Sequence, residues 1–368
     1  MLIIQASNVH QGGGRVLLEE IIRAMIESQS LPPKNNSGVP SHEPLILFVD
    51  RRFQVLPDWE QKLKIIKVSP SIPARLKVEF LIKKWAKEGD RVLCFGNLPP
   101  LFKPKATVSL FFQNVILFKE NSFVKFKLRT QIKHKIERIW IRYGLRHVSQ
   151  VVVQTFGVQR TFQKEFNFSK IKILPFVKLK NSSDLQISAN KKNYDFIYVA
   201  SGDPHKNHQK LVDAWILLAK ENKFPVLCLT VANHYQDLLK YVYRKKEEYK
   251  LKIFNFGENS RDEILNLYSQ SHAAIYPSLC ESFGLPLLEA RQYGLSIVAA
   301  ELDYVRDLLD PAESFDPNSA VSIARAVKRF LQIQEQKVEI CSTATFLHEV
   351  FTKKEELKNI QHMESGVE

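Results

Sequence analysis

The stretch Glu281-Ser-Phe-Gly-Leu-Pro-Leu-Leu-Glu289 follows an apolar run at 273–276 that a Pro-Ser pair closes. The apolar run is typical of a buried strand, and Pro286 is tolerated in the first turn of a helix. The sequence therefore predicts a strand, a loop with Glu281, and a helix from Pro286 whose second turn carries Glu289. The start of a helix offers unpaired N–H groups and a positive dipole end, which suit a phosphate. Two carboxylates beside it suit the hydroxyl groups of a sugar.

This stretch resembles the Glu-(x)7-Glu signature of family 4 retaining glycosyltransferases of the group 1 type, as in bacterial lipopolysaccharide, O-antigen and capsule biosynthesis. The resemblance implies an α/β chain of GT-B architecture, in which two Rossmann-like parallel-sheet domains face a central cleft. It also implies that Glu289 binds the nucleotide ribose and Glu281 the donor sugar. Phe283, Gly284 and Leu285 would then lie against the donor. Outside such a motif, a loop glutamate and a helix glutamate are ordinary solvated charges.

A second resemblance lies in Ala200–His208, after the predicted first strand of the C-terminal half. Family members have a lysine here that neutralises the donor diphosphate, and Lys206 matches it. The arginine that commonly precedes this lysine is missing, because Ser201 and the alanine before it occupy its place. Ser201 is a candidate donor contact, while His205, Arg261 or a backbone amide are the alternatives for the second phosphate ligand. A solvated loop lysine is the ordinary alternative for Lys206.

A run of glycines follows the first predicted strand. Gln11–Gly14 predicts a loop between a strand at 2–4 and a helix over 16–27, and it allows backbone to approach a ligand closely. A plain turn explains these glycines equally well. In the family that the chain resembles, the corresponding glycines line the cleft near the donor phosphates and the acceptor. The resemblance therefore implies that role for Gly13 and Gly14.

Two further loops match the family less closely. Gln113 and Asn114 occupy a strand end where many relatives have a histidine, and neither amide is a workable general base. The favoured mechanism of the family is front-face displacement, in which the leaving phosphate accepts the acceptor's proton, so Asn114 stays a catalytic candidate. An amide that caps a turn is the alternative. In the family that the chain resembles, the nucleotide base packs on backbone at the position that corresponds to Gly257.

The chain has 368 residues, enough for two or three domains, and strand-like and helix-like segments alternate along it. We expect an N-terminal acceptor-binding domain at 1–177, a connection at 178–193 and a C-terminal nucleotide-sugar-binding domain at 194–345. A helix and tail at 346–368 would follow. Residues 31–44 are rich in Pro, Asn, Ser and Gly and predict an exposed loop.

Composition points to a soluble protein of the reducing cytoplasm. Apolar residues make up 45% of the chain and charged residues 25%, and four scattered cysteines form no disulfide framework. We expect no signal peptide and no membrane-spanning segment.

The sequence has no Asp-x-Asp, and its ten histidines lack metal-ligand spacing. A metal-independent enzyme without a cofactor is therefore expected.

Positive charge is concentrated in the first half. Residues 1–175 hold 29 Lys and Arg against 13 Asp and Glu, a net +16, whereas residues 176–368 are at −2. Within the first half, residues 116–147 have nine basic and two acidic residues, and their apolar residues recur at helical spacing. Such a basic amphipathic helix suits an anionic membrane surface, nucleic acid or a solvated exterior. The membrane is favoured over a solvated exterior, because the charge is concentrated in one domain and many lipid-modifying GT-B enzymes, which the chain resembles, dock through their N-terminal domain. Nucleic acid is disfavoured, because the interleaved aromatic residues and a known motif are missing.

These observations predict a retaining hexosyltransferase that moves a sugar from a nucleotide diphosphate-sugar, UDP- or GDP-linked, to a hydroxyl of a lipid-linked saccharide. We expect it to be cytoplasmic and peripheral on the cytoplasmic face of the inner membrane, in surface polysaccharide assembly. The alternatives are a soluble transferase with a small or oligosaccharide acceptor and a catalytically silent GT-B protein that binds nucleotide-sugars. The sequence leaves the sugar, the base, the acceptor and the linkage open.

Overall fold

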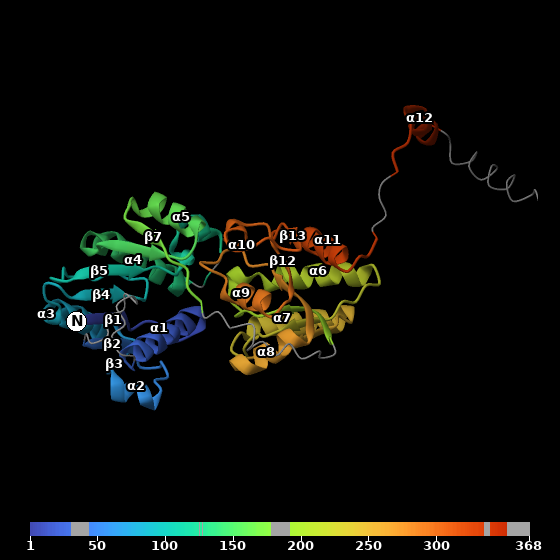
Figure 1. The fold of residues 1–368 in the computed structure, drawn as a ribbon. Helices are drawn as coiled ribbons and strands as arrows, with labels where there is room; N and C mark the ends of the chain where they lie inside the picture. Colours follow the sequence, from blue (N-terminus) through green and yellow to red (C-terminus); the bar gives the residue numbers. More distant parts are fainter. Residues whose placement is uncertain (31–43, 125, 127, 178–191, 335–338, 352–368) are drawn as a thin grey trace, which may run out of the picture. The chain divides into compact units, whose positions relative to one another are not determined.

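A computed structural model describes residues 1–30, 44–124, 126, 128–177, 192–334 and 339–351 (Figure 1). The chain forms two compact units, Met1–Phe330 and Leu331–Glu368. The first unit contains two parallel sheets flanked by helices, which confirms the predicted α/β architecture. In the second unit, the described residues include one helix, α12 (Thr343–Phe351).

The N-terminal domain is built on a seven-stranded parallel sheet with the order β3-β2-β1-β4-β5-β6-β7. Its strands are β1 (Leu2–Ala6), β2 (Leu45–Asp50), β3 (Lys64–Val68), β4 (Arg91–Cys94), β5 (Thr107–Phe111), β6 (Gln150–Val153) and β7 (Ile171–Ile173). Successive residues of a strand point to opposite faces of a sheet. Ile3 accordingly lies in one hydrophobic core and Ile4 in the other. Both faces of this sheet are therefore covered, as parallel sheets require.

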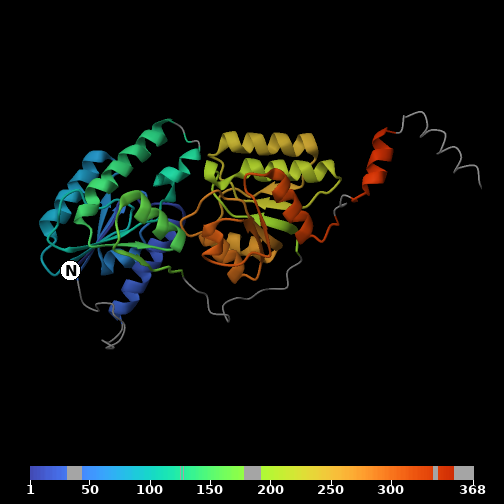
Figure 2. The same cartoon turned by 90° about the horizontal axis from the view of Figure 1, so that it is seen from above.

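Different helices cover the two faces of this sheet. The helices are α1 (Gly12–Ser30), α2 (Pro57–Lys62), α3 (Ile72–Trp85), α4 (Leu128–Gly144) and α5 (Phe156–Phe166), with short 3-10 turns η1 (Val115–Leu117), η2 (Lys119–Phe123) and η3 (Leu145–His147). Leu18 of α1 and Trp59 of α2 pack on the face that contains Ile4. Ile82 of α3, Ile141 of α4 and Phe162 of α5 pack on the opposite face. Figure 2 shows α3 and α4 next to each other on this second face.

The C-terminal domain repeats this plan with a six-stranded parallel sheet of order β10-β9-β8-β11-β12-β13. Its strands are β8 (Tyr194–Tyr198), β9 (Leu227–Leu229), β10 (Ile253–Asn255), β11 (Ser271–Tyr276), β12 (Ser296–Ala300) and β13 (Glu313–Phe315). Its helices are η5 (Pro204–Lys206), α6 (His208–Lys220), α7 (Gln236–Tyr249), α8 (Arg261–Ser269), α9 (Leu285–Gln292), α10 (Asp303–Arg306) and α11 (Ala320–Phe330). Figure 2 shows α6 and α7 on one face of the sheet and α9 on the other.

Both sheets reverse their strand order once, between β1 and β4 and between β8 and β11. In open parallel sheets, ligands bind outside the carboxyl ends of the strands at such a reversal. The segments that directly follow these four strands contain Gly13, Gly96, Lys206 and Glu281. The fold therefore directs the search for a functional site to these segments.

Two predicted boundaries were wrong. The glycine run was expected to form a loop, but α1 begins at Gly12, whose φ of +65° is left-handed. Glycine adopts that angle at little cost, so the helix can start directly after the turn. The helix with Pro286 begins one residue early, at Leu285, because a missing N–H costs nothing anywhere in the first turn.

Some expected segments lie outside the described residues, namely most of the loop at 31–44 and of the connection at 178–193. The first compact unit ends at Phe330, before the domain end at 345 that the sequence suggests. Of the helices within the described ranges, none is both long and apolar enough to span a bilayer.

Candidate functional site

A part-buried ion pair joins the segments that follow β8 and β11. The Nζ atom of Lys206 lies 2.6 Å from Oε1 of Glu281, and these side chains are 15% and 11% exposed. The hydroxyl of Tyr276, at the end of β11, donates a hydrogen bond of 3.3 Å to the same carboxylate oxygen. The structure thus brings together two of the three candidate catalytic residues, although 75 positions separate them in the sequence.

The charges of this pair are set by competing effects. Burial alone would raise the pKa of Glu281, but the charge of Lys206, together with hydrogen bonds from Lys206 and Ser278, lowers the pKa overall. The pKa of His205 is lowered by burial and by the adjacent Lys206. At neutral pH the carboxylate is therefore ionised and His205 is neutral. Lys206 supplies the positive charge, and His205 does not replace the missing arginine as a cation.

Hydrogen bonds to backbone hold the Lys206 loop in place. The buried hydroxyl of Tyr198 donates to the carbonyl of Lys206 at 2.8 Å and also lies 2.8 Å from Oγ of Ser278. Asn207 is left-handed, with φ of +61°, and its amide donates to the carbonyls of Pro277 and Pro317. The two loops therefore move little relative to each other, and the ion pair is preorganised.

The start of α9 lies against the glycine turn of the N-terminal domain. Gly284 caps α9 with φ of +67°, while the side chains of Phe283 and Leu285 are buried in the core that contains Ile4. Those two side chains therefore stabilise the fold, and only their backbone can face a donor. A Cβ atom on Gly13 would stand 3.1 Å from Cδ1 of Leu285, so the absence of a side chain permits this approach.

Glu289 lies one helical turn further along α9 and faces Arg261. The guanidinium of Arg261 is 3.9 Å from Glu289 and 3.8 Å from Glu20 of α1. Its side chain is 45% exposed, so it can exchange these carboxylates for a ligand. Arg261 remains a candidate for the second phosphate ligand. Sequence reasoning missed Glu20, since one glutamate on an amphipathic helix has no distinguishing pattern.

For four other candidate residues the structure shows local contacts. Gly14 lies close to the side chain of Gln113. A Cβ atom on Gly14 would be 3.4 Å from Oε1 of Gln113. The side-chain oxygen of Asn114 accepts the N–H of Ile116 at 3.2 Å and so caps η1, which is the structural alternative that the sequence left open. The hydroxyl of Ser201 donates to Asp203 at 2.7 Å. Gly257 has φ of +76° with open space on its Cβ side.

A cavity of about 300 Å³ opens beside Glu281. Leu279 and Cys280 line it from the C-terminal domain, and Asn121 and Thr161 line it from the N-terminal domain. Residues of both domains thus border the carboxylate, as the predicted central cleft requires. The cavity is of a size suited to a monosaccharide rather than to a whole nucleotide-sugar.

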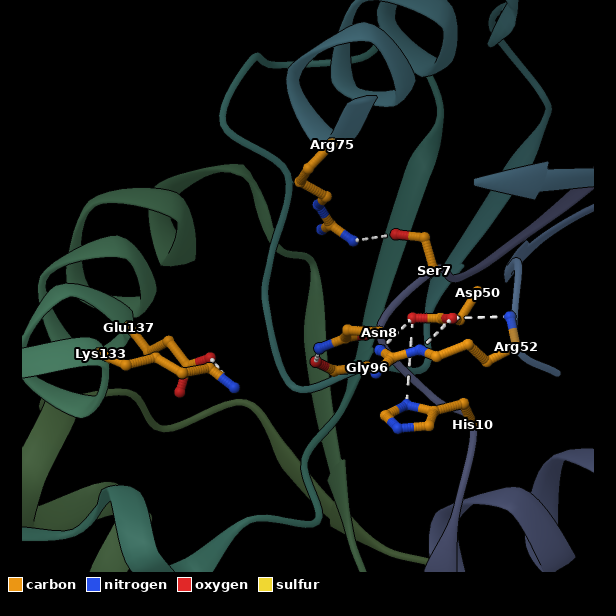
Figure 3. Close-up of polar contacts among 9 residues, drawn as sticks. All are labelled: Ser7, Asn8, His10, Asp50, Arg52, Arg75, Gly96, Lys133 and Glu137. Carbon is orange, nitrogen blue, oxygen red and sulfur yellow. Dashed lines mark hydrogen bonds and ion pairs between the residues drawn. The ribbon is translucent and has the colours of Figure 1, made fainter. Parts of the chain in front are cut away.

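A second polar group lies at the carboxyl edge of the N-terminal sheet (Figure 3). Arg52 donates two hydrogen bonds of 2.8 Å to the buried carboxylate of Asp50, and Nδ1 of His10 is 3.9 Å from the same group. Lys133 and Glu137 of α4 form a pair at 3.7 Å, and Figure 3 shows Lys133 reaching toward this region. We call these five residues the N-terminal polar cluster.

The neighbours of the N-terminal polar cluster hold the loop after β1. Arg75 of α3 donates to the hydroxyl of Ser7 at 2.9 Å, and the amide of Asn8 donates to the carbonyl of Gly96 at 2.5 Å (Figure 3). A Cβ on Gly96 would collide with Asn8, so glycine is required there. These contacts fix the β1 loop to the loop after β4, at the strand-order reversal.

Burial and neighbouring charges shift the pKa values of three residues in the N-terminal polar cluster. Burial lowers the pKa of His10, with a further contribution from Arg52, and both outweigh the opposing effect of Asp50. Burial would raise the pKa of Asp50, but its bonds to Arg52 lower it overall. Burial raises the pKa of Glu137 against the influence of Lys133. At neutral pH the cluster therefore offers a neutral imidazole beside an ionised Asp50–Arg52 pair.

The described part of the chain contains no group of three or more His, Cys, Asp or Glu placed to hold a metal ion. The candidate site contains Lys206, the carboxylates of Glu281 and Glu289, and the N-terminal end of α9. Such groups can neutralise a diphosphate and accept hydrogen bonds from sugar hydroxyls.

Comparison with known proteins agrees with this chemistry. Residues 181–345 match the family model of the glycosyl transferases group 1. The O-antigen chain mannosyltransferase RfbU of Salmonella typhimurium is 23% identical over 211 residues, which cover 54% of this chain and 57% of RfbU. The serotype-specific mannosyltransferase WbdA of Escherichia coli is 31% identical over 144 residues, 38% of this chain and 18% of WbdA. The matches thus span less than two thirds of these relatives.

The fold also matches solved structures along most of its length. Anabaena HepE, solved in complex with UDP and glucose, superposes with a TM-score of 0.63 at 15% identity, and the match covers 90% of each chain. This likeness confirms the predicted GT-B architecture. The chain therefore has the GT-B fold, and its residues 181–345 are similar to the group 1 glycosyl transferases.

Proposed function

We propose that this protein is a retaining, metal-independent hexosyltransferase of family 4. It moves a sugar from a nucleotide diphosphate-sugar to a hydroxyl of a lipid-linked saccharide during surface polysaccharide assembly, at the cytoplasmic face of the membrane. The part-buried Lys206–Glu281 pair at the carboxyl ends of β8 and β11 is the observation on which the proposal rests. RfbU, named as an O-antigen chain mannosyltransferase, supports the pathway class, and together with the mannosyltransferase WbdA it makes mannose the first sugar to test.

The donor half of the mechanism uses the C-terminal domain. The diphosphate lies between Lys206 and the start of α9, where a point charge and the positive end of the helix dipole meet. Negative charge grows on the departing phosphate as the sugar bond breaks, so Lys206 stabilises the transition state more than the bound donor. Glu281 accepts hydrogen bonds from the sugar hydroxyls and orients the ring. Glu289 does the same for the ribose.

The proton of the acceptor hydroxyl goes to the leaving phosphate. The amides at positions 113 and 114 cannot accept it. Front-face attack places the hydroxyl next to the oxygen that becomes the new phosphate anion, so no further base is needed. Because Lys206 supplies the charge that a divalent ion would otherwise supply, the reaction proceeds without a metal.

The acceptor half of the mechanism uses the N-terminal polar cluster, because it lies at the strand-order reversal of the other sheet. Paired carboxylates and guanidinium groups bind sugar hydroxyls in several directions at once. Arg52 is 53% exposed, so it can bind an acceptor while Asp50 orients it. The net charge of +16 in residues 1–175 suits an acceptor that is held at an anionic membrane.

Replacing Arg52 by glutamine should raise the KM for the acceptor about tenfold, because one charged hydrogen bond is worth ~1.5 kcal/mol. The affinity for the donor should not change, since the donor binds to the other domain. Arg51→Gln is the matched control, because Arg51 is exposed and adjacent in the sequence. Steady-state kinetics with each substrate varied separately checks this. Equal effects of the two substitutions would contradict the acceptor assignment.

Turnover of a nucleotide diphosphate-sugar by the purified protein, with a chelator present, tests the proposed function as a whole. Protein that binds such donors tightly but never consumes them would be catalytically silent. Turnover that the chelator abolishes would contradict the metal-free mechanism.

A further inference from the structure

The helix α4 exposes an apolar stripe to solvent. Its members are spaced four, four, three and four residues apart, so they lie on one face of the helix. The exposed fractions are 72% for Leu128, 51% for Ile132, 57% for Ile136, 67% for Ile139 and 49% for Tyr143. An apolar stripe of this kind normally faces the core of a domain. Here it faces outward, and we call these five residues the α4 stripe.

Contacts on the opposite side of α4 fix this orientation. The indole N–H of Trp140 donates to the carbonyl of Pro99 at 2.8 Å, and Ile141 is fully buried. The guanidinium of Arg138 donates to the carbonyl of Leu117 at 2.7 Å. Rotating the helix to bury the α4 stripe would break these bonds and expose Ile141. The stripe is therefore a stable surface feature of the N-terminal domain.

Basic side chains border the α4 stripe on both sides. Arg129, Lys133, Lys135 and Arg142 are exposed, whereas the acidic Glu137, a member of the N-terminal polar cluster, is only 16% exposed. The segment 116–147 has a net charge of +7. On this side of the molecule, apolar and cationic groups thus alternate along a single helix.

The neighbouring helix α3 also exposes apolar side chains. Arg75 of α3 packs 5.6 Å from the ring centre of Trp140, so α3 and α4 are in contact, and Figure 2 shows them side by side. Ile72 and Phe80 of α3 are 76% and 57% exposed. Five exposed apolar side chains on one helix, beside a helix that exposes two more, exceed the scattered apolar residues of an ordinary exterior.

We infer that the α4 stripe inserts into the boundary between headgroups and acyl chains of an anionic bilayer, with α4 parallel to the surface. The bordering lysines and arginines then bind lipid phosphates. This arrangement matches the interfacial helices of peripheral proteins, which combine an apolar face with cationic flanks. A second copy of the chain fits less well, because pairing two stripes would bring two segments of +7 together.

This inference deepens the proposed function, on which it rests for its purpose, by naming the surface that contacts the membrane. It also changes the expectation drawn from charge alone. A purely electrostatic attachment would be screened within about 8 Å at physiological salt and would be released as salt rises. Insertion of apolar side chains is not screened, so part of the binding should persist at high salt.

Sedimentation of the full chain with vesicles tests the inference. Vesicles of phosphatidylglycerol and phosphatidylethanolamine should bind the protein, and a fraction should stay bound at 0.5 M salt, which is roughly five times the concentration that gives a 10 Å Debye length. The variant Ile132→Ser/Ile136→Ser/Ile139→Ser keeps every charge and should bind at least tenfold more weakly. The control Tyr243→Ser/Val321→Ser removes exposed apolar side chains of the C-terminal domain and should bind normally.

Three results would overturn the inference. Complete release of the parent protein at high salt would mean that only electrostatic attraction holds it on the vesicles. A lower Tm of the stripe variant would mean that another part of the chain covers the stripe, and a change from dimer to monomer in size-exclusion chromatography would make a second copy its partner. Vesicle binding needs no catalysis, so a protein that binds vesicles but transfers no sugar would refute the proposed function and leave this inference intact.

Discussion

Replacing Lys206 by alanine is expected to lower donor turnover by about 10²–10³, the usual loss when one preorganised group is removed from a developing negative charge. The affinity for an uncharged acceptor should change little, because Lys206 lies in the donor domain. The substitution also leaves Glu281 buried without its cation, and breaking a buried pair costs roughly 3–5 kcal/mol of stability. Initial rates and the free energy of unfolding should therefore be measured together.

The double variant Lys206→Met/Glu281→Gln separates these two effects. It removes both charges at once, and neutral replacement of a buried pair is often tolerated. We expect it to recover most of the stability and none of the turnover. If turnover returned along with stability, Lys206 would serve only the fold. If Lys206→Ala consumed the donor at the rate of the parent protein, another cation would have to stabilise the leaving phosphate. Arg261 would then be the first candidate.

Glu289→Gln should weaken binding of the bare nucleoside diphosphate by about 10- to 100-fold, because hydrogen bonds from the ribose hydroxyls to a carboxylate are worth ~1.5–3 kcal/mol. Isothermal titration with UDP and GDP measures this directly. Glu247→Gln, an exposed glutamate of α7, is the matched control. Unchanged affinity in Glu289→Gln would reject the ribose assignment.

Glu281→Gln in the same titration tests whether Glu281 and Glu289 bind different parts of the donor. Since Glu281 contacts the sugar in our account, its loss should affect the nucleotide-sugar more than the bare nucleoside diphosphate. An equal loss for both ligands would place Glu281 on the diphosphate instead.

The sequence predicted the fold, and it singled out Lys206 and Glu281, which the structure brings together, because both predictions depend on local patterns. Alternating strands and helices determine a doubly wound sheet, and the motif from Glu281 to Glu289 lies on one strand–loop–helix unit. Lys206 could be placed near it because both loops follow strands that meet at the strand-order reversal. The role of Phe283 and Leu285 was harder to predict, since an apolar side chain beside a motif can face either ligand or core.

The N-terminal polar cluster could not be predicted from the sequence. His10, Asp50 and Lys133 come from three elements far apart in the chain, and each alone is an ordinary polar residue. Their positions at strand ends were the available clue, because parallel strands bring their carboxyl ends together. Tertiary contacts also decided the orientation of α4. Its periodicity predicted a helix, but only the bonds of Trp140 and Arg138 turn the apolar stripe outward.

The most direct test of the account is the anomeric configuration of the sugar released from an α-linked donor. The purified protein, in a chelator, is incubated with GDP-mannose or UDP-glucose, and proton NMR follows the anomeric signals from the first minutes. Slow hydrolysis suffices, because water can replace the acceptor. The account predicts that the α-anomer appears first and that Lys206→Met/Glu281→Gln releases none. Initial release of the β-anomer would contradict the retaining mechanism, and donors that bind but stay intact would contradict the transferase itself.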